Sequence, residues 1–198
     1  MRRFVLTTAI LTAFLLPAIV SADNQTRLKD KKILMIIAKG MFNESEFKEP
    51  KEILEREGAA VIIASCTSSE AIGDRGLKVT PHIHIRNINV KNFDAVVFIG
   101  VFGVSEYFNN PQAHKISKEA LDQNKILAAI CMAPRILANA GLLKGKKATS
   151  FPSASDDIKA KGALVTDKDV ERDGNIITAN GPGAASRFGK TIVLALIE

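Results

Sequence analysis

The chain has 198 residues, and 27 Lys and Arg against 21 Asp and Glu give it a formal net charge of +6. The basic residues are spread along the chain, and only one Tyr and no Trp could stack on bases. This composition argues against a nucleic-acid-binding protein, which would need a concentrated basic surface. No repeat or Pro/Gly-rich linker divides the chain, so we expect one domain.

Residues 1–22 have the parts of a signal peptide. Arg2 and Arg3 precede an apolar run over residues 4–16, and Val20-Ser21-Ala22 supplies small residues for cleavage after Ala22. The alternative is an uncleaved membrane anchor, but the apolar run is short for a spanning helix and Pro17 interrupts it. We therefore expect a periplasmic or secreted protein that is not embedded in the membrane after cleavage. A polar tail over residues 23–30 and one domain over residues 31–198 would remain.

Apolar segments alternate with helical patterns along this domain. Several runs are apolar throughout, which is typical of strands buried on both faces of a parallel sheet. Strands are expected at 32–38, 59–65, 95–99, 126–130 and 147–150, with a weaker extension over 77–85 and a hairpin of 163–170 and 175–179 around Asp173-Gly174. Helices are expected at 46–57, 111–122, 134–140 and 184–197, with a helical turn at 155–161. The alternation predicts a flavodoxin-like three-layer α/β/α sandwich with a mostly parallel sheet.

A single cysteine, Cys131, lies between a predicted strand and a predicted helix. Ala129 and Ala133 stand two residues to either side, and Pro134 suits a first helical turn. Small residues at these positions are typical of a nucleophile elbow, a crowded strand-to-helix turn. The helix N-terminus is expected to favour the thiolate. The alternative interpretation is a small, buried core cysteine.

Four loops follow predicted strands at the edge of the sheet where ligands bind in such folds. They are residues 39–46, residues 100–103, the elbow at Cys131 and residues 180–183. The three histidines, His82, His84 and His114, have no carboxylate or cysteine at a supporting spacing. We therefore assign no metal ligand and expect no cofactor.

Four segments resemble the ThiJ/PfpI family of the class I glutamine amidotransferase-like superfamily. They are 128–134 (AAICMAP), 46–50 (EFKEP), 99–103 (IGVFG) and 177–183 (ITANGPG), and the resemblance extends over residues 32–196.

The resemblance implies roles for particular residues. Cys131 would be the nucleophile and Glu46 the acidic residue whose carboxyl group hydrogen-bonds its sulfur. The backbone N–H groups of Gly100, Gly103 and Met132 would form an oxyanion hole. The pocket would include Phe151, Asn180 and Gly181, and the protein would form a homodimer.

The chain also departs from the family pattern. Family enzymes usually carry a histidine directly after the cysteine or in a later loop, where this chain has Met132 and Phe151. Val101 interrupts the paired glycines of the glycine loop. A thiol without a neighbouring base lacks the proton shuttle that catalytic turnover needs.

Three functions remain open. The first is an exported, redox-responsive thiol protein of oxidative or carbonyl stress, in which Cys131 is oxidised to sulfenic or sulfinic acid. The second is a glyoxalase-, deglycase-, amidase- or peptidase-like cysteine enzyme acting on a small carbonyl or peptide-like substrate. The third is a non-catalytic holdase or binding protein.

The second cysteine, Cys66, is expected to be structural and unpaired. If the elbow strand and the second strand flank the first strand, as the resemblance implies, two inter-strand gaps separate the cysteines. Those gaps sum to about 9–10 Å, which exceeds the Cα separation of about 7 Å that a disulfide allows.

The exported protein is predicted to begin at Asp23, because cleavage is expected after Ala22. N-terminal sequencing of protein from the periplasmic or secreted fraction would check this. Recovery of intact Met1 from washed membranes would instead identify an anchor.

Overall fold

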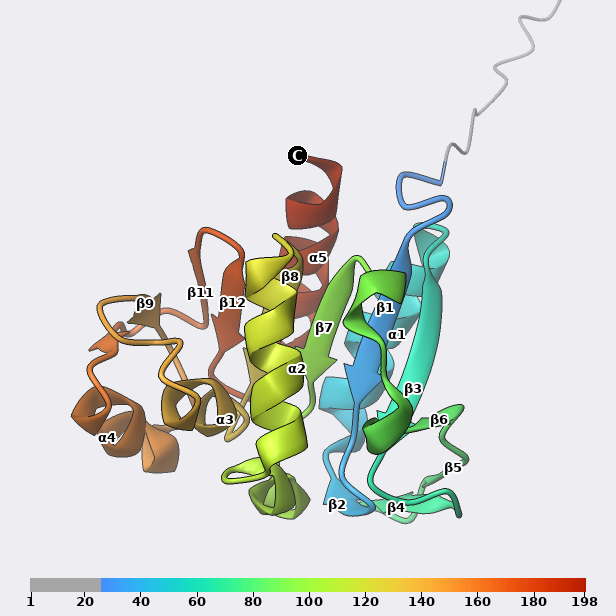
Figure 1. Cartoon of the computed structure of the whole chain (residues 1–198), viewed down its shortest axis with the longest axis horizontal. Helices are drawn as coiled ribbons and strands as arrows, with labels where there is room; N and C mark the ends of the chain where they lie inside the picture. The colour runs from blue at the N-terminus through green and yellow to red at the C-terminus, as the bar shows by residue number, and fades with distance from the viewer. Residues whose placement is uncertain (1–25) are drawn as a thin grey trace, which may run out of the picture.

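The structure is a computed structural model that describes residues 26–198, so the predicted signal peptide and residues 23–25 lie outside the described residues. A seven-stranded sheet forms its centre (Figure 1). Its strands are β1 (Lys32–Ile36), β3 (Ala60–Ser65), β6 (Ile83–His84), β7 (Ala95–Phe98), β8 (Ile126–Ile130), β11 (Val170–Asp173) and β12 (Ile176–Ala179). Their order is β11-β12-β8-β7-β1-β3-β6, and every neighbouring pair is parallel except β11 with β12.

Helices cover both faces of this sheet (Figure 1). They are α1 (Glu44–Arg56), α2 (Pro111–Asp122), α3 (Pro134–Asn139), α4 (Pro152–Ala160) and α5 (Ala185–Ile197). Ile33 and Met35 of β1 belong to the core that includes residues of α1 and α5, whereas Leu34 and Ile36 belong to the core that includes residues of α2, α3 and α4. Burial on both faces explains the uninterrupted apolar strands and confirms the predicted three-layer sandwich. Within residues 26–198, no helix has the length and apolar composition to cross a membrane.

Short elements extend this frame. A three-stranded sheet contains β2 (Gly40–Phe42), β4 (Ala71–Gly73) and β5 (Lys78–Val79), and a two-stranded sheet contains β9 (Lys147–Ala148) and β10 (Leu164–Val165). Single turns of 3-10 helix occur at Ile85–Asn87, Val90–Asn92 and Pro182–Ala184, and a longer one at Phe102–Tyr107. The small β2-β4-β5 sheet lies next to the start of α1, where it helps to shape the site.

One strand prediction is wrong in detail, and the weaker extension over residues 77–85 is divided between two sheets. The expected strand 163–170 is divided, because Leu164-Val165 pairs with β9 and Val170 begins the strand that pairs with β12. The turn at Asp173-Gly174 is confirmed, and Gly174 has a φ of 62°. The weak stretch 77–85 contributes β5 to the small sheet and β6 to the edge of the large sheet. Both differences reflect pairing with strands distant in the sequence.

The expected strand order is also wrong, because β7 lies between β1 and the elbow strand β8. The two cysteines are therefore further apart across the sheet than predicted: Cys66 follows β3, which is three strands from β8. Both cysteines are free.

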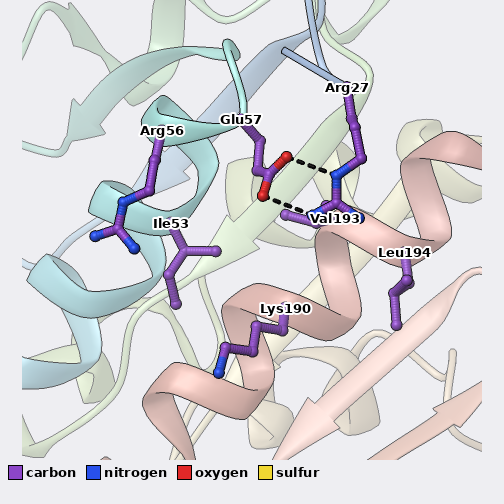
Figure 2. Close-up of a pocket in the computed structure, with 7 residues that line it drawn as sticks. All are labelled: Arg27, Ile53, Arg56, Glu57, Lys190, Val193 and Leu194. Atoms are coloured by element: carbon purple, nitrogen blue, oxygen red, sulfur yellow. Dashed lines mark hydrogen bonds and ion pairs between the residues drawn. The ribbon is translucent and has the colours of Figure 1, made fainter. Parts of the chain in front are cut away.

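Residues 26–30, expected as part of a polar tail, pack against the domain. Leu28 is fully buried, and its N–H donates to Glu57 O at 2.7 Å. The Arg27 guanidinium donates Nε–H and Nη2–H to the two oxygens of Glu57, each at 2.6 Å. Figure 2 shows this pair at one end of a groove of about 300 Å³ between α1 and α5. The pair fixes the chain entering β1 to the C-terminal end of α1.

Helices α1 and α5 approach closely at Gly189. A Cβ atom at this position would lie 2.9 Å from Pro50 Cα and 3.2 Å from Ile53 Cδ1. Gly189→Val is therefore expected to lower the free energy of unfolding by about 1–3 kcal/mol through overpacking. Urea denaturation would measure the loss, and Gly183→Val is the matched control because a Cβ there has no neighbour within 4 Å. Equal stability of the two variants would show that this contact does not limit the α1–α5 packing.

Candidate functional site

A strained strand-to-helix turn, at the position of the predicted elbow, directly follows β8. Cys131 has a φ of +64°, a left-handed conformation that costs a non-glycine residue roughly 1–3 kcal/mol and is found preferentially at functional sites. Its N–H donates to Ala179 O of the neighbouring strand at 2.9 Å. Ala129 and Ala133 are fully buried on either side, so larger side chains would have no room there. The turn therefore holds the cysteine at the carboxyl edge of the sheet.

Glu46 is brought to the same edge by the first turn of α1. The helix begins at Glu44 rather than at the expected Glu46, because Asn43 is the N-cap and its Oδ1 accepts the Glu46 N–H at 3.0 Å. The Asn43-x-x-Glu46 spacing is that of a capping box, in which the glutamate usually accepts the N–H of the capping residue. Here the Asn43 N–H donates to Gly100 O at 3.3 Å instead. The Glu46 carboxyl group is left to point into the site.

Gly100 lies against the side chains of both Glu46 and Cys131. Its N–H donates to Glu46 Oε2 at 3.1 Å. A Cβ atom on this residue would lie 2.5 Å from Cys131 Cβ, 2.5 Å from Ile130 O and 2.8 Å from Glu46 Oε2. Only a glycine allows the carboxyl group and the cysteine to approach this closely.

Burial dominates the electrostatics of Glu46, which has no exposed surface. Burial raises the pKa of its carboxyl group to about 7, an effect partly offset by the neighbouring Cys131 thiol and the Gly100 N–H, while the negative charge of Asp74 adds to the rise. Among the described residues, its second oxygen, Oε1, has no hydrogen-bond partner. A carboxyl group with this pKa can gain or lose a proton near neutral pH.

The expectation of a lowered thiol pKa is wrong. Cys131 is 2% exposed, and this burial, with the negative charge of Glu46, raises the pKa of the thiol to about 12. The backbone N–H groups of Val101 and Met132 act in the opposite direction. The helix after the elbow has only six residues, and its N-terminal field does not outweigh burial.

The three expected backbone donors have different surroundings. The Met132 N–H lies beside the sulfur, but the Gly100 N–H is occupied by Glu46. Gly103 lies in the 3-10 helix Phe102–Tyr107, where any Cβ would overlap Gly40 O, so the glycine permits close packing on β2. Val101 is a further backbone donor that was not predicted from the sequence. Its φ is +81°, and its N–H lies beside the sulfur of Cys131. A backbone donor leaves no side-chain signal in the sequence.

The three predicted pocket residues lie around the elbow in two groups. The Phe151 N–H donates to Cys131 O at 2.8 Å, and the Phe151 ring comes within 3.2 Å of where a Cβ on Gly181 would lie. Asn180 instead turns to Asp169, which accepts both its backbone N–H at 2.9 Å and its side-chain amide at 3.2 Å. The backbone of Phe151 is thus hydrogen-bonded to Cys131, and the Phe151 ring has no lone pair to accept a proton.

The histidines hydrogen-bond to backbone groups. Nδ1 of His82 accepts the Ile63 N–H, Nδ1 of His84 accepts the Arg86 N–H, and Nε2 of His114 pairs with Phe108 O. Within residues 26–198, no group of three His, Cys, Asp or Glu side chains is arranged to hold a metal ion. The chemistry that this site offers comes from one thiol, one carboxyl group and backbone N–H groups.

Comparisons with known proteins identify relatives that share the sequence and the fold over most of the chain. An uncharacterised protein of Methanocaldococcus jannaschii is 38% identical over 179 residues, which cover 89% of this chain and 87% of that protein. Deglycase PfpI of Pyrococcus furiosus is 34% identical over 152 residues, 77% of this chain and 91% of the deglycase. The crystal structure of a ThiJ/PfpI domain protein from Brachyspira murdochii has a TM-score of 0.82 at 28% identity, covering 85% of this chain and 96% of that one.

The resemblance found in the sequence is thereby confirmed. The sequence model of the DJ-1/PfpI family matches residues 31–195, nearly all of the described chain. This chain belongs to the DJ-1/PfpI family.

Proposed function

We propose that this protein is a redox-responsive thiol protein of oxidative or carbonyl stress, in which Cys131 is the reactive group and Glu46 its proton partner. The observation that carries the proposal is a carboxyl group with no exposed surface beside a thiol that is 2% exposed. Two buried titratable groups in contact are costly to maintain and are typical of functional sites.

The two groups titrate as a pair. Burial raises the pKa of the carboxyl group to about 7 and helps to raise that of the thiol to about 12, so the pair loses the carboxyl proton first. Between these values it carries one negative charge, and transfer of the thiol proton to the carboxylate moves that charge to sulfur. The Gly100 N–H stabilises the charge on Glu46, and the Val101 and Met132 N–H groups stabilise it on Cys131. The thiolate form is thus reached without adding a second buried charge.

Oxidation by hydrogen peroxide uses both members of the pair. The thiolate attacks one peroxide oxygen, a sulfur–oxygen bond forms, and the oxygen–oxygen bond breaks. The departing hydroxide takes the proton from the Glu46 carboxyl group, which leaves sulfenic acid, water and the carboxylate. The sulfur is oxidised, the peroxide is reduced, and the net charge of the site is unchanged.

A deglycase-like activity is the second candidate, supported by the likeness to the Pyrococcus furiosus deglycase. In that case Cys131 would add to a small carbonyl substrate, with Glu46 returning the proton. Met132 and Phe151 stand at the two positions where family enzymes usually have a histidine, so we expect turnover to be slow. A non-catalytic binding role would leave Cys131 unreactive toward both peroxide and small carbonyl compounds.

Export and homodimer formation are further proposals. Export rests on residues 1–22, and homodimer formation rests on the family resemblance.

The rate of Cys131 oxidation by dilute peroxide is expected to increase as pH rises through about 7, where the pair loses its first proton. Glu46→Gln keeps the shape but removes the titrating group, so the step near pH 7 should disappear and the rate at pH 8 should fall by about 10²-fold. Peptide mass spectrometry would follow Cys131, with the partly buried Cys66 as an internal reference in the same sample.

Cys66 also has a neighbouring carboxyl group, because burial and Glu106 raise the pKa of its thiol. Glu106, however, is only partly buried, and Cys66 does not lie in a strained turn of positive φ. Faster oxidation of Cys66 than of Cys131 would contradict the proposal. An unchanged Cys131 profile in Glu46→Gln would remove Glu46 from the chemistry.

Phe151→His is expected to increase turnover of glyoxals, because residue 151 lies against the elbow and an imidazole would supply the missing base. A general base typically contributes roughly 10²–10⁴-fold, so even an imperfectly oriented ring should give a measurable gain. Lactate or glycolate formation would be measured, with Phe151→Leu as the control for changed size.

Phe151→His combined with Cys131→Ala should be inactive. Efficient turnover by the unmodified protein would show that another group already acts as the base. A folded Phe151→His variant without any gain would show that this loop does not serve the chemistry.

A further inference from the structure

Asp74, in the turn after β4, contacts the start of α1 through both carboxylate oxygens. Oδ2 accepts the side-chain amide Nδ2–H of Asn43 at 2.9 Å, and Oδ1 accepts the backbone N–H of Glu44 at 3.2 Å. Asp74 is itself fixed, because its N–H donates to Phe42 O at 2.9 Å. The small β2-β4-β5 sheet thereby holds Asn43, which is the N-cap of α1, the helix that contains Glu46.

The chemistry of this position requires a group that only accepts hydrogen bonds. Both partners of Asp74 are donors, so a carboxylate satisfies them and an amide cannot satisfy both. The contact also decides which way the Asn43 amide faces. With Nδ2 held by Asp74, Oδ1 is directed to the Glu46 N–H. Reversal of the amide would set two N–H groups against each other at Glu46 and leave Asp74 facing an oxygen.

We propose that Asp74 is a positioning residue for the thiol–carboxyl pair: it locks the Asn43 amide, which in turn holds Glu46 at a fixed place in the first helical turn. This inference rests on the proposed function of Cys131 and Glu46. The chain of contacts continues from Asn43 to Gly100, because the Asn43 N–H donates to Gly100 O and the Gly100 N–H donates to Glu46 Oε2. Loss of the lock would let the carboxyl group move away from both Gly100 and the sulfur.

The other acidic group at this corner has a different task. Glu44 Oε1 accepts the backbone N–H groups of Arg75 and Leu77 at 3.0 and 2.7 Å, and Oε2 pairs with Lys48 at 3.4 Å. Its carboxylate therefore holds the β4–β5 turn and makes no contact with Asn43 or Glu46 among the described hydrogen bonds. Asp74 is the residue whose substitution would act on the cap.

An exchange of the two side chains tests the lock. Asp74→Asn leaves two amides whose donors face each other, so oxidation of Cys131 by peroxide at pH 8 should slow by about tenfold through misplacement of Glu46. In the double variant Asn43→Asp with Asp74→Asn, the new carboxylate at position 43 accepts from the Glu46 N–H and from the new amide at position 74. The oxygen of that amide accepts from the Glu44 N–H. The exchange restores every hydrogen bond and the net charge, so the rate should return to within about threefold of the unmodified protein.

Asn43→Asp alone sets two carboxylates against each other, and adding Asp74→Asn to it should raise the rate. This comparison remains decisive if Asp74→Asn alone does not fold. A double variant no faster than either single variant would overturn the proposal.

A double-mutant cycle that combines Asp74→Asn with Glu46→Gln distinguishes failure of this inference from failure of the proposed function. If Asp74 acts through Glu46, Asp74→Asn should have little effect on the Cys131 rate in a Glu46→Gln background, whereas general loosening of the fold would slow both backgrounds equally. Equal slowing would overturn the positioning role while leaving the thiol–carboxyl pair intact. If Glu46→Gln itself leaves the rate unchanged, the proposed function fails instead.

Discussion

The site depends on keeping the carboxyl group of Glu46 out of contact with water. Burial of an ionised carboxylate without compensation is strongly unfavourable, so the protein needs either a proton or a donor at that place. It has both: the raised pKa allows a proton to remain near neutral pH, and the Gly100 N–H binds Oε2. This arrangement requires a glycine at position 100 and a fixed position of the first turn of α1 relative to the sheet. The packing of α1 against α5 helps to maintain that position.

Burial of the sulfur would restrict the molecules that can reach Cys131 in the proposed function. A thiol that is 2% exposed is shielded from bulky thiols and from other proteins. A molecule as small as a peroxide or a short carbonyl compound needs much less displacement of the surrounding groups to reach it. The same burial disfavours the thiolate, and the shared proton of the pair offsets part of that cost by keeping a single charge in the site. In the proposed function, shielding and activation of the thiol would therefore both follow from this burial.

Much of the fold and the position of Cys131 within it could be predicted from local sequence. Apolar runs such as residues 126–130 identify strands buried on both faces, and the small residues around Cys131 indicate a crowded strand-to-helix turn. The strand order could not be predicted, because the insertion of β7 between β1 and β8 depends on pairing between distant segments. The thiol pKa could not either, since it is set by burial that only the tertiary structure reveals. The capping role of Asn43 could have been predicted, because its spacing to Glu46 is that of a helix cap. Asp74 and Val101 act through tertiary contacts that leave no pattern in the sequence.

The attachment of Phe151 to the elbow involves only backbone atoms, since its N–H donates to Cys131 O. Its side chain is 40% exposed and fills no space in the core. The identity of residue 151 is thus uncoupled from the integrity of the turn that it touches. A lineage could exchange a proton-transferring ring for an inert one at this point, or the reverse, without rebuilding the scaffold. A substitution at this one position could therefore change the chemistry available at the site while the turn keeps its geometry.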